Sequence, residues 1–195
     1  MKVVFEGLDG CGKGTTIREL EALISAKIYE TPEQFKRIRR ERVSELGDGS
    51  KLHEFMLESY VKEWKEIELI ETQLKNGEAL LIDRSWSSYN SVRFARLGGQ
   101  VAWPNHCMPD VAFSIRVDEE IRVRRLLERE GSEDRLNDRE VQLIRDGMFR
   151  ERIMMAEREL GCIPLRIRER NPKVVALRAL QYLLGRPDFI YVPRD

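Results

Sequence analysis

The sequence predicts an α/β protein with a five-stranded parallel sheet that is flanked by helices. Five short apolar runs, at about residues 2–6, 27–29, 79–82, 111–117 and 163–167, alternate with longer segments of helical periodicity. Strands separated by helices form parallel sheets, because a parallel connection needs a crossover long enough to hold a helix. A glycine-rich segment directly after the first run lies where such sheets bind ligands.

Composition limits the classes of protein that fit. The 195 residues, 42% of them hydrophobic and 35% charged, suit a single domain over residues 1–195 with one buried core. The 34 basic and 34 acidic side chains balance, so we expect no nucleic-acid partner and no membrane surface. Three cysteines without metal-ligand spacing, and no apolar run of membrane-spanning length, predict a cytoplasmic protein.

The glycine-rich segment predicts a phosphate-binding loop over residues 7–16. Its nucleotide-binding residues are expected to be Gly7, Asp9, Gly10, Cys11, Gly12, Lys13, Gly14, Thr15 and Thr16. Glycines let successive backbone N–H groups turn toward phosphate oxygens, Lys13 adds a positive charge, and the helix expected from Ile17 adds its N-terminal dipole. The natural occupant is a nucleoside triphosphate.

A magnesium ion is expected with that nucleotide. The usual loop has serine or threonine directly after the lysine, as a magnesium ligand, whereas this chain has Gly14. Thr15 is therefore expected to take that role or to leave it to water. Asp83, at the end of the third apolar run, is the second expected ligand, directly or through water.

The second strand and the long helix after it face the expected acceptor. The corner Glu30-Thr31-Pro32 leads into a basic helical segment at 35–40, from which Arg39 is expected to reach an acceptor phosphate. The helical stretch from 51 to 75 carries an apolar stripe that is interpreted as core, and Asn76-Gly77 ends it.

The third strand ends in Asp83-Arg84-Ser85, and hydroxyl side chains follow it. Arg84 is expected to clamp a second phosphate with its planar fork of donors. The alternative is a structural Asp–Arg pair that closes the strand.

Basic and acidic residues alternate between residues 119 and 139, around Gly131-Ser132. Such a pattern is typical of a solvated helix face, and this interpretation is preferred for Arg122 and Arg124. Arg125, Arg129 and Arg135 are instead expected to act on the transferring phosphoryl group, the last two from a lid at about 129–140.

Three segments resemble the thymidylate kinase family of nucleoside monophosphate kinases. They are Val4 to Lys13, Asn76-Gly77 to Asp83-Arg84 with Ser88 four residues later, and Pro109-Asp110-Val111 with Val117 to Glu120 and Arg125. The resemblance covers most of the chain. It implies a three-layer P-loop kinase fold, a short arginine-rich lid and a homodimer packed through helices beside the sheet. It also implies that Asp9 contacts the sugar 3′-hydroxyl, and that a loop with Gly10 instead of arginine relies on lid arginines.

The chain departs from the family where the acceptor base is recognised. The family's stacking aromatic residue falls near Glu58 and its following arginine near Lys62 or Glu63, so Phe55 or Tyr60 is expected to stack instead. The family's Thr-Arg-Glu-Pro-Gly-Gly corner is replaced by Tyr29 to Pro32, which lacks the glycine pair.

The expected activity is magnesium-dependent transfer of the γ-phosphoryl group of ATP to a deoxyribonucleoside monophosphate, with dTMP preferred. The expected catalytic residues are Lys13, Asp83, Arg84, Arg129 and Arg135; the expected substrate-binding residues are Asp9, Arg39, Phe55, Tyr60, Arg84 and Ser88. One alternative is a deoxynucleoside kinase, which Asp83-Arg84-Ser85 also resembles, with Glu30 removing a proton from a sugar 5′-hydroxyl. A further alternative is a nucleotide-binding switch without catalysis, for which Gly14 is the best support.

Overall fold

A computed structural model describes residues 1–195 apart from 48, 106, 131–140, 142–143, 168–170 and 194–195. The five predicted strands are confirmed, with the bounds β1 Lys2–Glu6, β2 Ala26–Glu30, β3 Ala79–Asp83, β4 Val111–Val117 and β5 Ile163–Ile167. They form one parallel sheet in the order β2-β3-β1-β4-β5. The central strand β1 therefore delivers the phosphate-binding loop to the middle of the carboxyl edge.

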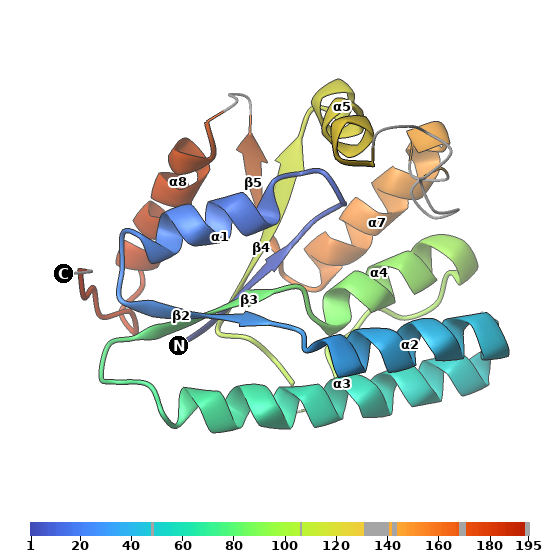
Figure 1. The fold of residues 1–195 in the computed structure, drawn as a ribbon, viewed down its shortest axis with the longest axis horizontal. Helices are drawn as coiled ribbons and strands as arrows, with labels where there is room; N and C mark the ends of the chain where they lie inside the picture. Colours follow the sequence, from blue (N-terminus) through green and yellow to red (C-terminus); the bar gives the residue numbers. More distant parts are fainter. Residues whose placement is uncertain (48, 106, 131–140, 142–143, 168–170, 194–195) are drawn as a thin grey trace.

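Helices cover both faces of this sheet (Figure 1). The helices α1 (Lys13–Glu21) and α8 (Pro172–Leu184) pack together on one face. The other face carries α3 (Ser50–Glu71), α4 (Trp86–Leu97) and α7 (Gly147–Glu159), with α2 (Glu33–Leu46) packed on α3. The helix α5 (Glu119–Glu130) follows β4 at the carboxyl edge. The predicted α/β architecture is confirmed, while all but the first two residues of the predicted lid lie outside the described residues.

The two faces of β1 explain how a charged group enters the interior. Val3 and Phe5 pack in the core beneath α1 and α8, and Val4 packs in the core beneath α3. Because side chains alternate along a strand, Glu6 follows Val4 onto the second face, where it is completely buried.

Several helices begin at capping residues. The side chains of Ser85, Asp146 and Asn171 accept backbone N–H bonds at the starts of α4, α7 and α8, over distances of 3.3, 2.9 and 3.0 Å. The long helix was predicted to reach Lys75, but α3 ends at Glu71. The backbone N–H groups of Gln73 and Leu74 instead donate to carbonyls three residues earlier, which is the tighter hydrogen-bond pattern of a helix end. The turn therefore begins before Asn76-Gly77.

The C-terminal segment after α8 packs against the opposite, amino edge of the sheet. The backbone N–H of Ser25 donates to the carbonyl of Val192 at 2.7 Å, and Phe189 packs against the core beneath α1 and α8. Among the described residues, no helix has the length and apolar character needed to cross a membrane.

Candidate active site

The phosphate-binding loop lies directly against β4. Gly7 has a φ of +131°, and a Cβ added there would sit 2.5 Å from the carbonyl oxygen of Ile115. A larger residue at this position would push the loop away from the sheet, which is why the sequence needs glycine there.

Lys13 is the first residue of α1 and is only 6% exposed. Its Nζ atom donates to the carbonyls of Gly7 at 2.8 Å and Leu8 at 3.3 Å, so the ammonium group bends back over the loop. Cys11 is buried within the loop, and burial raises the pKa of its thiol. The thiol therefore stays protonated at neutral pH, and Cys11 serves the loop as a small buried residue.

Arg84 joins the loop to β3. Its guanidinium donates to the carboxylate of Asp9, and its backbone N–H donates to the carbonyl of Phe5 at 3.1 Å. Burial acts to lower the pKa of Arg84, but the carboxylates of Asp9 and Asp83 keep it above its ordinary value, so the group stays charged. The residue has a φ of +72°, in the left-handed region that costs a non-glycine residue roughly 1–2 kcal/mol.

The helix α5 supports the loop from its other side. Arg122 is 1% exposed, donates to the carbonyl of Asp9 at 3.1 Å and pairs with Glu119 at 2.6 Å. The interpretation of Arg122 as part of a solvated face is therefore wrong, because an alternating charge pattern does not reveal which turn of the helix meets the loop. Arg124 does lie on the exposed face, paired with Glu128 at 4.0 Å.

Two of the three arginines that were predicted to act on the transferring phosphoryl group lie on α5. Arg125 donates to the carbonyl of Cys11 at 3.5 Å, so it too contacts the loop. Arg129 is exposed in the last turn of α5. Arg135 lies outside the described residues, and its predicted role stays a prediction.

The side chain of Asp83 fits a magnesium ion. Within the described part of the chain, its Oδ1 atom is buried without a hydrogen-bond partner. A buried carboxylate oxygen without a partner is costly unless a cation neutralises it. Asp83 Oδ2 lies 4.0 Å from where a Cβ of Gly14 would be, so the carboxylate faces the start of α1. Thr15, the other expected ligand, is exposed in the first turn of that helix.

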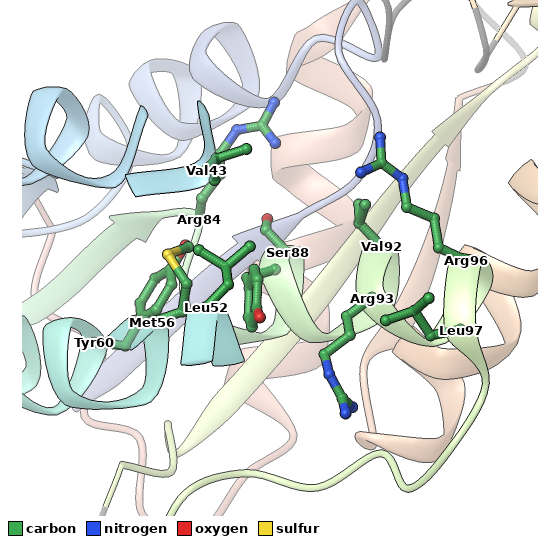
Figure 2. Close-up of a pocket in the computed structure, with 11 residues that line it drawn as sticks. Val43, Leu52, Met56, Tyr60, Arg84, Ser88, Val92, Arg93, Arg96 and Leu97 are labelled. Carbon is green, nitrogen blue, oxygen red and sulfur yellow. The ribbon is translucent and has the colours of Figure 1, made fainter. Parts of the chain in front are cut away.

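A cavity of about 290 Å³ lies between α3 and α4, next to Arg84 (Figure 2). Leu52, Met56 and Tyr60 line it from α3, and Ser88 and Val92 line it from α4. Part of the stripe interpreted as core thus lines a cavity. Among the described residues, three arginines also line it, Arg84, Arg93 and Arg96, and no carboxylate does.

Some of the residues that were predicted to bind the acceptor line the cavity, and others do not. Tyr60, Arg84 and Ser88 line it, whereas Phe55 does not and lies 5.6 Å from the guanidinium of Arg42. Arg39 is 8% exposed and does not line the cavity.

Arg39 instead joins α2 to α3. It donates to Ser59 at 2.9 Å and Glu63 at 2.6 Å, and its guanidinium carbon lies 3.6 Å from the centroid of the Tyr60 ring. Its contact with an acceptor phosphate stays a prediction that requires the pair with Glu63 to open.

Two buried carboxylates beneath the site escaped the sequence analysis. Glu6 accepts hydrogen bonds from the hydroxyls of Ser85, at 2.6 Å, and Ser88, and burial raises its pKa. Glu157 of α7 accepts from Ser114, and burial raises its pKa to about 7. A glutamate at the end of an apolar strand is the signal that could have identified Glu6.

Comparison with known proteins fits this geometry. A sequence model described as thymidylate kinase matches residues 5–157, from the end of β1 to α7. The chain belongs to the thymidylate kinase family. As a member of this family, the protein is a phosphotransferase. The phosphate-binding loop and the arginine-lined cavity fit that activity. A sequence comparison with curated proteins gives no match.

Solved structures of thymidylate kinases share the fold. The enzyme from Candida albicans aligns with a TM-score of 0.63 and 15% identity, over 99% of this chain and 96% of its own. The enzyme from Ehrlichia chaffeensis aligns with a TM-score of 0.53 and 16% identity, over 94% of this chain and 98% of its own. Deoxyadenosine kinase from M. mycoides with bound dCTP aligns with a TM-score of 0.61 and 16% identity, over 95% of this chain and 100% of its own. At these identities the likeness concerns the fold alone.

Proposed function

We propose that this thymidylate kinase family member transfers the γ-phosphoryl group of ATP to a deoxyribonucleoside monophosphate, with dTMP as the first candidate. The observation that carries the proposal is the cavity beside the phosphate-binding loop, which, in the part of the chain that the structure describes, is lined by three arginines and by no carboxylate. The pair between Arg84 and Asp9 places this cavity at the loop, as phosphoryl transfer between two bound substrates requires.

The charge of the cavity favours an anionic acceptor. A monophosphate oxygen is already a nucleophile, so it needs only to be positioned for attack on the γ-phosphorus, from which ADP leaves. Guanidinium groups bind phosphate strongly through pairs of parallel N–H donors. A nucleoside hydroxyl would instead need a free base within reach. Among the described residues no carboxylate lines the cavity, and the two carboxylates that contact its lining residues, Asp9 and Glu6, are bound to Arg84 and to the hydroxyls of Ser85 and Ser88.

The residues divide between donor and acceptor. Lys13 and the loop N–H groups would hold the β- and γ-phosphates. Asp83 would hold magnesium together with the hydroxyl of Thr15. A magnesium ion bound there would neutralise charge on the triphosphate. Arg84 would contact the acceptor phosphate, with Ser88 and Tyr60 farther along the cavity. Arg129 and Arg135 would complete the site over the transferring group.

A deoxynucleoside kinase is the second candidate, because Glu30 pairs in register with Asp83 at the carboxyl edge of the sheet. Glu30 is exposed and is not among the cavity-lining residues. If it is a base, Glu30→Gln should abolish phosphorylation of nucleosides. Under our proposal the same variant phosphorylates monophosphates at close to the wild-type rate.

A product assay tests the proposal. The protein is incubated with ATP, magnesium and each of dTMP, dCMP, dGMP and dAMP, and the diphosphate is detected directly. We expect a diphosphate from at least one of them, and from dTMP first. Lys13→Ala, which removes a charge at the donor phosphates, should lower turnover by roughly 10²–10³-fold and so exclude a contaminating kinase. Absence of any diphosphate product would overturn the proposal.

A further inference from the structure

We propose that Arg96, in the last turn of α4, is a second residue that binds the acceptor phosphate, beside Arg84. The inference rests on the proposed function and names a contact within the same cavity. No motif in the sequence pointed to Arg96. The structure singles it out by where α4 places it and by the direction of its side chain.

The register of α4 brings Arg96 to the cavity. Ser88, Val92 and Arg96 follow one another at intervals of four residues, which places them along one stripe of the helix. All three line the cavity. Arg96 therefore shares a surface with Ser88, which already belongs to the acceptor side.

The three arginines that line the cavity do not all point the same way. Figure 2 shows the side chains of Arg84 and Arg96 running toward the same end of the cavity, the end toward which the Ser88 hydroxyl points, whereas Arg93 runs the opposite way. The pair between Arg84 and Asp9 identifies that end as the one beside the phosphate-binding loop.

The chemistry requires the acceptor phosphate at that end. The attacking oxygen must reach the γ-phosphorus held by the loop, so the base must extend toward the opposite end of the cavity, the end toward which Arg93 runs in Figure 2. Arg84 is already paired with the carboxylate of Asp9, so an incoming phosphate dianion needs a further cation. Arg39 is buried in its bonds to Ser59 and Glu63 and does not line the cavity. Arg96 has an interaction of its own, but it is exposed and lines the cavity, so an incoming phosphate can reach its guanidinium by exchange.

The test compares a monophosphate with its own nucleoside. For wild type and Arg96→Gln we would measure KM for the monophosphate best used in the product assay and Ki for the matching nucleoside as a competitive inhibitor. We expect Arg96→Gln to raise the monophosphate KM by roughly 10–100-fold, which corresponds to one lost charge-assisted hydrogen-bond contact. The nucleoside Ki and the KM for ATP should change less than about twofold, because neither ligand has the acceptor phosphate.

Three variants serve as controls. Arg93→Gln removes an arginine from the same helix that points away from the phosphate end, so any effect should weaken monophosphate and nucleoside equally. Arg124→Gln removes an exposed arginine of α5 that does not line the cavity, and it should leave both constants unchanged. Arg96→Lys should recover part of the monophosphate affinity. Thermal unfolding of each variant verifies that it is folded.

Other outcomes would overturn the inference. If Arg96→Gln leaves the monophosphate KM unchanged, or weakens nucleoside and monophosphate equally, Arg96 does not bind the phosphate although the proposed function stands. If the wild type uses no monophosphate, the proposed function and the role of Arg96 fail together.

Discussion

At the scale of single residues, Arg84 links the phosphate-binding loop to the cavity that we propose for the acceptor. Its side chain pairs with Asp9 in the phosphate-binding loop while it also lines the cavity between α3 and α4. The backbone at Arg84 is in the left-handed region, which is unfavourable for a residue with a side chain. Such strain persists where the surrounding contacts fix it, and here the bonds to Phe5 and Asp9 do so.

Gly14 is the residue whose change should improve the site. A serine there would place a hydroxyl near Asp83, because the Cβ position already lies 4.0 Å from Asp83 Oδ2. We predict that Gly14→Ser lowers the magnesium concentration needed for half-maximal activity and strengthens magnesium-dependent ADP binding in calorimetry. Gly14→Ala adds the Cβ without the hydroxyl and is the matched control. Equal behaviour of the two variants would contradict the assignment of this site to magnesium.

Glu157 should make stability depend on pH. It is buried, and it lies near Glu6, Arg116 and Lys13. Burial raises its pKa from an ordinary 4.5 to about 7. Between pH 4.5 and about pH 7 the native protein keeps the proton on Glu157, whereas the unfolded chain has lost it. The contribution of Glu157 to the free energy of unfolding therefore falls as the pH rises, and it is lost above about pH 7.

Glu157→Gln removes this titration. We predict that the stability of the variant relative to wild type grows between about pH 5 and pH 8, by up to about 3 kcal/mol. Urea unfolding at both pH values measures the difference. Glu159→Gln, an exposed change on the same helix, controls for the loss of one carboxylate. A difference between Glu157→Gln and wild type that stays constant with pH would show that Glu157 does not titrate in this range.

At the scale of elements, the β3–α4 connection positions the cavity that we propose for the acceptor. Ser85 caps α4 and, with Ser88, donates to the buried carboxylate of Glu6 at the end of β1. These bonds tie the start of α4 to the strand that carries the loop. The same helix then carries Ser88, Val92 and Arg96 along the cavity.

The C-terminal segment should stabilise the turn before β3. Gly77 has a φ of +85°, and a Cβ there would sit 2.5 Å from Val192 Cγ2. We predict that Gly77→Ala lowers the free energy of unfolding by about 2–4 kcal/mol, from backbone strain and overpacking together. Gly98→Ala is the control, because Gly98 has a φ of +71° with nothing within 4 Å, so it measures a backbone cost, of roughly 1–3 kcal/mol, without any packing clash. Equal losses in thermal or urea unfolding would mean that the segment contributes nothing at this turn.

At the scale of the whole molecule, the order of elements could be predicted because each strand is a compact apolar run and each crossover has helical spacing. The loop could be predicted because its glycines and Lys13 are adjacent in sequence. The environment of Arg122, the partners of Glu6 and Glu157 and the pair between Arg39 and Glu63 could not. Each depends on residues distant in sequence that meet only in the folded chain, and charge patterns carry no information on such contacts. The homodimer stays a prediction, which sedimentation of the purified protein would test.

The proposed function requires that the acceptor is a monophosphate and not a nucleoside. The most direct measurement is a competition in one tube, with equal concentrations of dTMP and thymidine, limiting ATP and magnesium, and products separated by chromatography. The cavity lined by arginines predicts that dTDP forms first and that thymidine stays unphosphorylated. Consumption of thymidine with no dTDP formed would contradict the proposed function and favour Glu30 as the base of a nucleoside kinase.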